Sequence, residues 1–379
     1  MSGKLILILM LVVQSVAFSW EEFIQEDLKV AINRFSGSKV KFMGAKGDLY
    51  LEIGEGTGKK VYKIPEDHPE EISVDGEGLR FKGIYAKEIR VFKGEFNAVV
   101  MLSSDGKTYS PYRGDMEFIP YKGRVLPINS IQSEEYIYSV VPSEIGHYFP
   151  TEAIKAQVLA ARTYLYYNLA NYKYEKFDLL DNVNSQMYLG RERENEKINT
   201  LVNETVGEII VHEGKPINAL YYSTNGGRTA NNEDVWGGSA VPYLRGKKDS
   251  ASEAKSPRLN WNVSISKKEL SQKAGFRVDR IRVIKVASNR VHTLELIGSQ
   301  RKRISGNELR RIVGYNKLHS TQFRVTDKGS TFAFKGKGSG HGVGMSQYGA
   351  YGLANAGKSY DRIVKHYYKG VQIKKLKND

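Results

Sequence analysis

The sequence contains no cysteine, which excludes disulfide bonds, thiolate metal sites and a cysteine nucleophile. Beyond residue 19 it also lacks any apolar run long enough to span a bilayer as a helix. Acidic residues do not balance the basic ones: 42 Asp and Glu against 57 Lys and Arg give a formal net charge of +15 over 379 residues. This charge favours an anionic partner such as wall polymer, anionic lipid or nucleic acid, although basic residues spread along a chain are also typical of a solvated surface. No nucleic-acid-binding motif accompanies the charge, so we expect no nucleic-acid partner.

The first 19 residues have the pattern of a secretory signal peptide. Lys4 precedes the apolar run Leu5–Val13, and Ala17 and Ser19 offer small side chains at the −3 and −1 positions of a cleavage site. We expect cleavage after Ser19 and export to the periplasm or the extracellular cell wall. The alternative is an uncleaved segment that anchors the protein in the membrane, facing the wall.

Residues 20–111 are predicted to form a β-rich accessory module. An amphipathic helix is expected at Glu21–Phe35, and short alternating runs separated by Gly, Asp and Lys then indicate antiparallel strands. These strand candidates are Lys39–Met43, Leu49–Ile53, Lys60–Ile64, Leu79–Lys82, Ile89–Phe92 and Ala98–Leu102. We find no catalytic group of residues in this part of the sequence.

A carboxyl group before a long helix is the most chemically suggestive feature of the chain. Glu144 lies in a segment punctuated by Pro, Ser and Gly, which indicates a turn, and the Ala-rich segment Thr151–Tyr167 predicts an amphipathic helix. Lys155 and Arg162 are seven residues apart and therefore share one stripe of that helix. They could face a ligand near Glu144, but an ion pair of Arg162 with Glu144 or Glu152 explains the pattern equally well.

Two polar, glycine-rich segments come later in the chain. Ser223–Thr229 ends a predicted hairpin and precedes Asp234–Gly237, an order typical of a loop that lines a site, although a capped turn accounts for it as well. In Gly338–Gly344 every second residue is glycine, so we expect the backbone to approach something closely there. Between these segments, residues 258–333 alternate strand and helix patterns, which predicts a small inserted α+β subdomain.

The segment Gly352–Ser359 matches the phosphate-binding P-loop pattern letter for letter. A P-loop requires a buried strand before it and a long helix after it, whereas this segment is predicted to end one helix and begin another. We therefore expect no nucleotide and no other cofactor. We also expect no metal ion, because no further His or carboxylate completes a metal site with Glu144 and His147.

Three separated blocks of the sequence resemble, in the expected order, those of the sporulation stage II protein D/LytB family. The first block is Tyr136–Val141, Ser143, Glu144, Glu152–Gln157 and Ala160–Tyr164; the second is Tyr222–Thr229 with Asp234–Gly237; the third is Gly338–Ala350 with His366–Tyr368. The resemblance extends from Tyr112 to Ile373 and leaves residues 20–111 outside it. It implies a peptidoglycan lytic transglycosylase or, alternatively, a non-enzymatic wall-binding protein that enhances a cell-wall amidase.

For such an enzyme, the resemblance implies that Glu144 is the general acid and base. It would cleave the β-1,4 bond after N-acetylmuramic acid and close a 1,6-anhydro ring, on glycan strands already stripped of stem peptides. Apolar neighbours are expected to raise the pKa of Glu144, and Asp234 is the candidate for the second carboxylate that a hydrolase would need. The other candidate substrate contacts are Lys155 and Arg162 for carboxylates, Trp236 for stacking on a sugar, and Gln157, Ser223, His341, Gln347 and Tyr348 for polar groups. Several have plain structural alternatives, since a Trp is more often buried and a lone His is more often a satisfied structural residue.

The sequence thus predicts the α+β class. We expect a signal peptide at residues 1–19, the β-rich module at 20–111, a mixed helical and antiparallel-strand catalytic core at 112–257 and 334–379, and the inserted α+β subdomain at 258–333.

Overall fold

The computed structural model describes residues 27–54, 58–95, 97–182, 184–249 and 255–376. The expected signal peptide lies outside these ranges. Among the residues described, no helix combines the length and apolar character that crossing a membrane requires. Helices and antiparallel sheets both occur throughout, so the predicted α+β class is confirmed.

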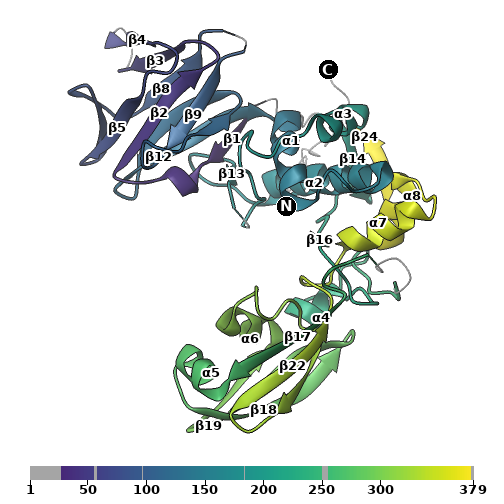
Figure 1. The fold of residues 1–379 in the computed structure, drawn as a ribbon. Helices are drawn as coiled ribbons and strands as arrows, with labels where there is room; N and C mark the ends of the chain where they lie inside the picture. The colour runs from purple at the N-terminus through teal and green to yellow at the C-terminus, as the bar shows by residue number, and fades with distance from the viewer. Residues whose placement is uncertain (1–26, 55–57, 96, 183, 250–254, 377–379) are drawn as a thin grey trace, which may run out of the picture.

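Two sheets, antiparallel except for the parallel pair β1–β13, form the part of the molecule at the upper left of Figure 1. The seven-stranded sheet has the order β13-β1-β12-β11-β8-β3-β4, and the six-stranded sheet has the order β10-β9-β2-β5-β6-β7. The strands are β1 (Asp27–Ala31), β2 (Lys39–Ala45), β3 (Leu49–Ile53), β4 (Lys60–Ile64), β5 (Glu70–Asp75), β6 (Gly78–Phe81), β7 (Ile84–Ala86), β8 (Ile89–Lys93), β9 (Val99–Ser103), β10 (Ser110–Tyr112), β11 (Asp115–Tyr121), β12 (Arg124–Gln132) and β13 (Leu179–Leu180). Alternating apolar residues of both sheets face one core, where Phe42 of β2 packs on Phe118 of β11 at 5.5 Å between ring centroids.

Two sequence-based expectations need correction here. The chain at Asp27–Ala31 is a strand paired with β12, not the second half of a helix at Glu21–Phe35. In addition, the seven-stranded sheet continues across the expected boundary between residues 111 and 112, because β11 and β12 pair with β8 and β1. Pairing between strands far apart in sequence leaves no local signal in the sequence. The pattern of residues therefore predicted a boundary at a place where the sheet is continuous.

A helical layer packs beside the sheets, built around the long helix α2 (Thr151–Asn171). The Ala-rich sequence of α2 favours the helix and lets neighbours approach, and α1 (Ser133–Glu144), α3 (Glu196–Glu204), α7 (Gln347–Asn355) and α8 (Tyr360–Tyr367) all pack against it. The chain returns at its end through β24 (Gln372–Lys375), which pairs with β14 (Glu208–His212) next to β15 (Lys215–Pro216). The helix predicted at Thr151–Tyr167 is therefore confirmed.

The segment between the second and third sequence blocks forms a separate lobe at the bottom of Figure 1. Its elements are β17 (Asn260–Ser266), α5 (Lys267–Ala274), β18 (Val278–Ala287), β19 (Arg290–Gly298), β20 (Arg301–Ser305), α6 (Gly306–Val313), β21 (Phe323–Asp327) and β22 (Thr331–Lys337). Trp261, Leu294 and Phe334 belong to a hydrophobic core of its own. The strands and helices predicted in this region are confirmed.

The glycine-rich segment ends this lobe and returns to the helical layer. There β23 (Met345–Ser346) pairs in parallel with β16 (Tyr221–Tyr222). Gly344 has φ 79°, and a Cβ atom on it would lie 2.0 Å from the carbonyl oxygen of Leu220. The expected close approach is confirmed, and the partner is the protein's own backbone. Likewise, the P-loop-like letters span the end of α7 and the start of α8, as predicted.

Candidate functional site

Glu144 is the last residue of α1 and opens into a cavity of about 260 Å³. The expected turn is therefore wrong: the helix runs on through Pro142, and Ser143 Oγ donates to the Ser139 carbonyl oxygen at 2.9 Å. The cavity is lined by Glu144, Tyr164, Ser185, Gln186, Met187, Leu220, Tyr221 and His341. These residues come from α1, α2, β16 and three loop segments, so parts of the chain far apart in sequence build the site.

The surroundings of Glu144 favour its protonated form. Burial raises its pKa from 4.5 to about 7, and a hydrogen bond with the Tyr221 side chain opposes this only in part. The Tyr221 hydroxyl is itself held by Gln186, whose Nε2 donates to it at 3.2 Å and to the Ala161 carbonyl oxygen at 3.3 Å. A carboxyl group with a pKa near 7 can both donate and accept a proton at neutral pH.

His341 lies across the same cavity in a fixed tautomer. The Val343 backbone N–H donates to its Nδ1 at 3.2 Å, so the proton is on Nε2, which donates to the Tyr221 carbonyl oxygen at 3.0 Å. Burial lowers the pKa of His341 to about 3, which keeps the ring neutral. A neutral ring with both nitrogens engaged positions its neighbours and does not exchange protons with a substrate.

An exposed aromatic ring extends the site outward. Trp236 ends α4 (Asn232–Trp236) with 52% of its surface exposed, and its ring lies 5.2 Å from that of His341. The ring of Tyr222 lies 5.1 Å from His341. Trp236 therefore does not have the buried position that is more common for tryptophan, and its ring lies beside the cavity that holds Glu144.

A second aromatic group flanks the chain just after Glu144. Tyr148 is 63% exposed, and its hydroxyl lies 3.4 Å from that of Tyr348. The Tyr348 ring packs on Phe149 at 5.3 Å between centroids, and the Tyr348 backbone N–H donates to the Ser223 carbonyl oxygen at 3.0 Å. Tyr348 and Ser223, both candidates from the sequence, therefore lie near this edge of the site without lining the cavity itself.

Two predicted cationic contacts are structural instead. Arg162 is fully buried, forms a two-pronged ion pair with Glu134 at 2.7 and 2.8 Å, and donates to the carbonyl oxygens of Val202 and Glu208. Lys155 forms an ion pair with Glu204 at 2.8 Å. Lys155 and Arg162 share one face of α2, as predicted, but this face meets α3 and β14. The partner of Arg162 is neither Glu144 nor Glu152.

Three further candidates lie outside the cavity lining. Asp234 Oδ2 accepts hydrogen bonds from Asn231 Nδ2 at 2.9 Å and from Ser288 Oγ at 2.5 Å, so this oxygen helps to hold the local fold. Gln347 is buried at the start of α7. Gln157 is buried on α2, and among the described residues neither of its amide atoms has a hydrogen-bond partner.

Sequence reasoning missed several residues of the cavity. Tyr221 directly precedes the second sequence block, which begins at Tyr222. Because neighbouring residues of a strand face opposite sides, this position next to the block is the signal that could have identified Tyr221 as a second candidate. Ser185, Gln186 and Met187 lie in a loop with no recognisable pattern. Within the described residues, no group of three or more His, Asp and Glu side chains could hold a metal ion.

The site defines a class: a single buried carboxyl group in a cavity bordered by exposed aromatic rings. Comparison with known proteins agrees with the motif-based assignment, because the family model described as SpoIID, stage II sporulation protein, matches residues 121–212. Stage II sporulation protein D of Bacillus subtilis is 35% identical over 65% of this chain and 75% of its own length. The chain belongs to this family.

Two other relatives match a larger share of this chain. An uncharacterised protein of Brachyspira hyodysenteriae is 34% identical over 77% of this chain and 79% of its own length. A protein of Bacillus subtilis named amidase enhancer is 28% identical over 88% of this chain but only 53% of its own length. Similarity to this last relative therefore includes the N-terminal β-rich part of the chain.

Proposed function

We propose that this protein is an exported peptidoglycan lytic transglycosylase in which Glu144 is the general acid and base. The observation that carries the proposal is the isolation of Glu144: it is the one carboxyl group among the described residues that line its cavity, and burial raises its pKa to about 7. Family membership supports a function at the cell wall. The signal-peptide pattern of residues 1–19 supports export.

In the proposed reaction, the protonated Glu144 donates its proton to the glycosidic oxygen while the bond from C1 of the muramic acid sugar to that oxygen breaks. The C6 hydroxyl oxygen of the same sugar attacks C1, and the Glu144 carboxylate accepts the hydroxyl proton. The ring closes as a 1,6-anhydro sugar and the carboxyl group is restored, so the step consumes no water. The hydrogen bond from Tyr221 would stabilise the carboxylate formed between the two proton transfers.

Hydrolysis would require a second carboxylate on the other side of the sugar as nucleophile or base. Asp234 is the candidate, but its Oδ2 accepts hydrogen bonds from both Asn231 and Ser288, and it does not line the cavity. This arrangement favours attack by the sugar's own hydroxyl over attack by water. Trp236 fits a neighbouring sugar, because an exposed indole beside a cavity can stack on the apolar face of a pyranose ring.

The test is digestion of glycan strands from amidase-treated sacculi, with the products resolved by mass. We expect termini lighter by one water than reducing muramic acid, and a loss of about 10²–10⁴-fold in rate for Glu144→Gln. Asp234→Asn is the matched control and should keep most of the activity. Reducing-end muramic acid without anhydro sugar would replace this mechanism with hydrolysis, and loss of activity in the Asp234 variant would identify the second carboxylate.

A second candidate function is that of a non-enzymatic enhancer of a cell-wall amidase. It is supported by the name of one relative and by the excess of basic residues, which suits binding to an anionic wall. The same Glu144→Gln variant separates the two functions. Unchanged lysis in the presence of an amidase, together with retained sacculus binding, would favour the enhancer.

A further inference from the structure

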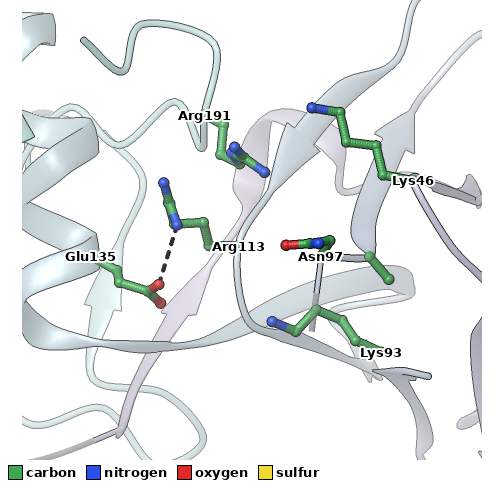
Figure 2. A pocket seen from close by; sticks show the side chains of 7 residues that line it. Lys46, Lys93, Asn97, Arg113, Glu135 and Arg191 are labelled. Carbon is green, nitrogen blue, oxygen red and sulfur yellow. Dashed lines mark hydrogen bonds and ion pairs between the residues drawn. The ribbon is translucent and has the colours of Figure 1, made fainter. Parts of the chain in front are cut away.

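A second cavity, with no lining residue in common with the Glu144 cavity, lies between the β-sheets and the start of α1. Its volume is about 460 Å³, and it is lined by Lys46, Lys93, Asn97, Ala98, Arg113, Glu135 and Arg191. Figure 2 shows the cationic side chains arranged around one space, with Glu135 reaching in from α1. Four cations and one carboxylate leave the lining strongly positive.

The cations arrive from separate parts of the chain. Lys46 sits in the turn after β2, Lys93 ends β8, Arg113 lies between β10 and β11, and Arg191 belongs to the loop before α3. Like charges brought together in a partly closed space repel one another unless an anion joins them. A random distribution of surface lysines would not converge in this way.

Arg113 is the fixed element of this cavity. Its guanidinium forms a two-pronged pair with Glu194 at 2.7 Å for both bonds and also meets Glu135 at 3.4 Å. Even with Glu194 counted, the cavity retains an excess of positive charge. Neither Lys46 nor Lys93 has a side-chain ion pair with any residue that the structure describes.

Lys46 is held in place at a backbone cost. Its φ of 60° lies in the left-handed region, which a lysine adopts less readily than glycine or asparagine, and its backbone N–H donates to Glu66 at 2.6 Å. A turn at this position would form more easily without a side chain. This turn positions Lys46 so that its side chain lines the cavity.

We propose that this cavity binds a short acidic peptide of the kind that wall stem peptides provide, with at least two carboxylates and one amino group. The choice of a wall peptide rests on the proposed function at the cell wall. The volume of the cavity suits a small organic molecule and exceeds what a single inorganic anion would fill. The arginine forks and lysine ammonium groups match carboxylates. Glu135 matches an amino group, and the amide of Asn97 matches a peptide bond.

This binding site is independent of glycan cleavage. Glu135 and Glu144 are nine residues apart on α1, which corresponds to a separation of about 14 Å along the axis and to opposite faces of the helix. Because the two side chains face opposite sides of α1, a peptide bound in this cavity need not belong to the sugar at Glu144. The cavity would instead bind a peptide elsewhere in the wall and hold the enzyme there.

The test is calorimetric titration of the full chain, carrying Glu144→Gln so that cleavage plays no part. The probe is synthetic L-alanyl-γ-D-glutamyl-meso-diaminopimelate, and the same peptide with its carboxylates amidated is the ligand control. We expect saturable binding of the acidic peptide, weakened at least tenfold by the double variant Lys46→Gln/Lys93→Gln. These lysines are chosen because Arg113 also supports the fold through Glu194.

The matched control is Lys60→Gln/Lys87→Gln, which removes two exposed lysines of the same β-rich part and the same amount of charge. It should bind the peptide as tightly as the parent chain. Equal weakening in both double variants, equal binding of the amidated peptide, or no saturable binding would overturn the proposal. Inorganic phosphate that competes as well as the peptide would reduce the cavity to a general anion site and overturn its peptide specificity.

Discussion

Glu144 illustrates how one residue can serve chemistry at the expense of stability. Its pKa is about 7 in the folded protein and near 4.5 when exposed, so the folded state binds the proton more tightly. The resulting stabilisation is complete below pH 4.5 and is lost as the pH rises to about 7. Above that pH, the buried charged carboxylate lowers the stability of the folded state by a constant amount.

We therefore predict that Glu144→Gln raises the free energy of unfolding relative to the parent protein, and that this gain is larger at pH 8 than at pH 4. The shift of pKa from 4.5 to about 7 corresponds to about 3 kcal/mol of unfolding free energy. Urea unfolding of both proteins at the two pH values measures the difference. Glu175→Gln makes the same change of charge at an exposed position and should show no such dependence. A variant no more stable than the parent at pH 8 would contradict the raised pKa.

The predictability of the site also varies residue by residue. Glu144 could be identified from its block, and its apolar neighbourhood was expected. The hydrogen bond between Tyr221 and Glu144 was not expected, because Tyr221 and the Gln186 that holds it are 35 residues apart and meet only through the fold. Arg162 was misassigned because helical periodicity predicts which residues share a face but not what that face meets.

At the scale of elements, Arg162 joins four of them. From α2 it reaches Glu134 on α1, the Val202 carbonyl oxygen on α3 and the Glu208 carbonyl oxygen on β14. A buried guanidinium with all these partners holds the helices in one arrangement, and removing it would leave Glu134 without its ion-pair partner.

We predict that Arg162→Lys lowers the unfolding free energy by about 2–3 kcal/mol, because an ammonium group cannot reproduce the two-pronged pair and the two carbonyl contacts. The control is Arg277→Lys, whose exposed pair with Asp279 should contribute less than about 1 kcal/mol. Chemical denaturation measures both. Normal stability with weakened glycan binding would instead restore Arg162 to the role first expected from the sequence.

Elements with a strong local signal were predicted well. The Ala-rich helix α2 and the capped helices of the inserted lobe, such as α6 with Ser305 accepting from the Glu308 N–H, carry their signals in adjacent residues. The strand β1 did not, because its five residues read equally well as a helix face and become a strand only by pairing with β12. Short apolar runs are ambiguous until their partner is known.

On the scale of the whole molecule, the residues that the structure describes form two separate large cores. One is shared by the β-sheets and the helical layer, so the N-terminal strands do not pack independently of the helices. The other belongs to the inserted lobe alone. The lobe enters and leaves through neighbouring strands, since Asn260 pairs with Lys337, and such an insertion places little strain on its host.

The lobe nevertheless reaches the candidate site. Asn307 Nδ2 donates to the Val235 carbonyl oxygen at 3.1 Å and Ser288 Oγ donates to Asp234, so α6 and the β18–β19 turn hold α4 in place. Trp236 is the last residue of that helix. The lobe thus supports the aromatic ring next to the cavity, while Glu144 comes from the main body.

We predict that residues 258–338 fold on their own, because their core draws on no residue outside them. The isolated fragment should melt cooperatively, and a near-ultraviolet circular dichroism signal from the buried Trp261 should disappear with the transition. Replacing the same residues by a short Gly-Ser linker should leave the main body folded but weaken glycan binding, because α4 loses its support. Trp236→Ala in the intact chain is the control that separates loss of the ring from loss of the fold. Melting of the fragment without cooperativity would contradict an autonomous lobe. A shortened chain that binds glycan like the parent would contradict the support of Trp236 by the lobe.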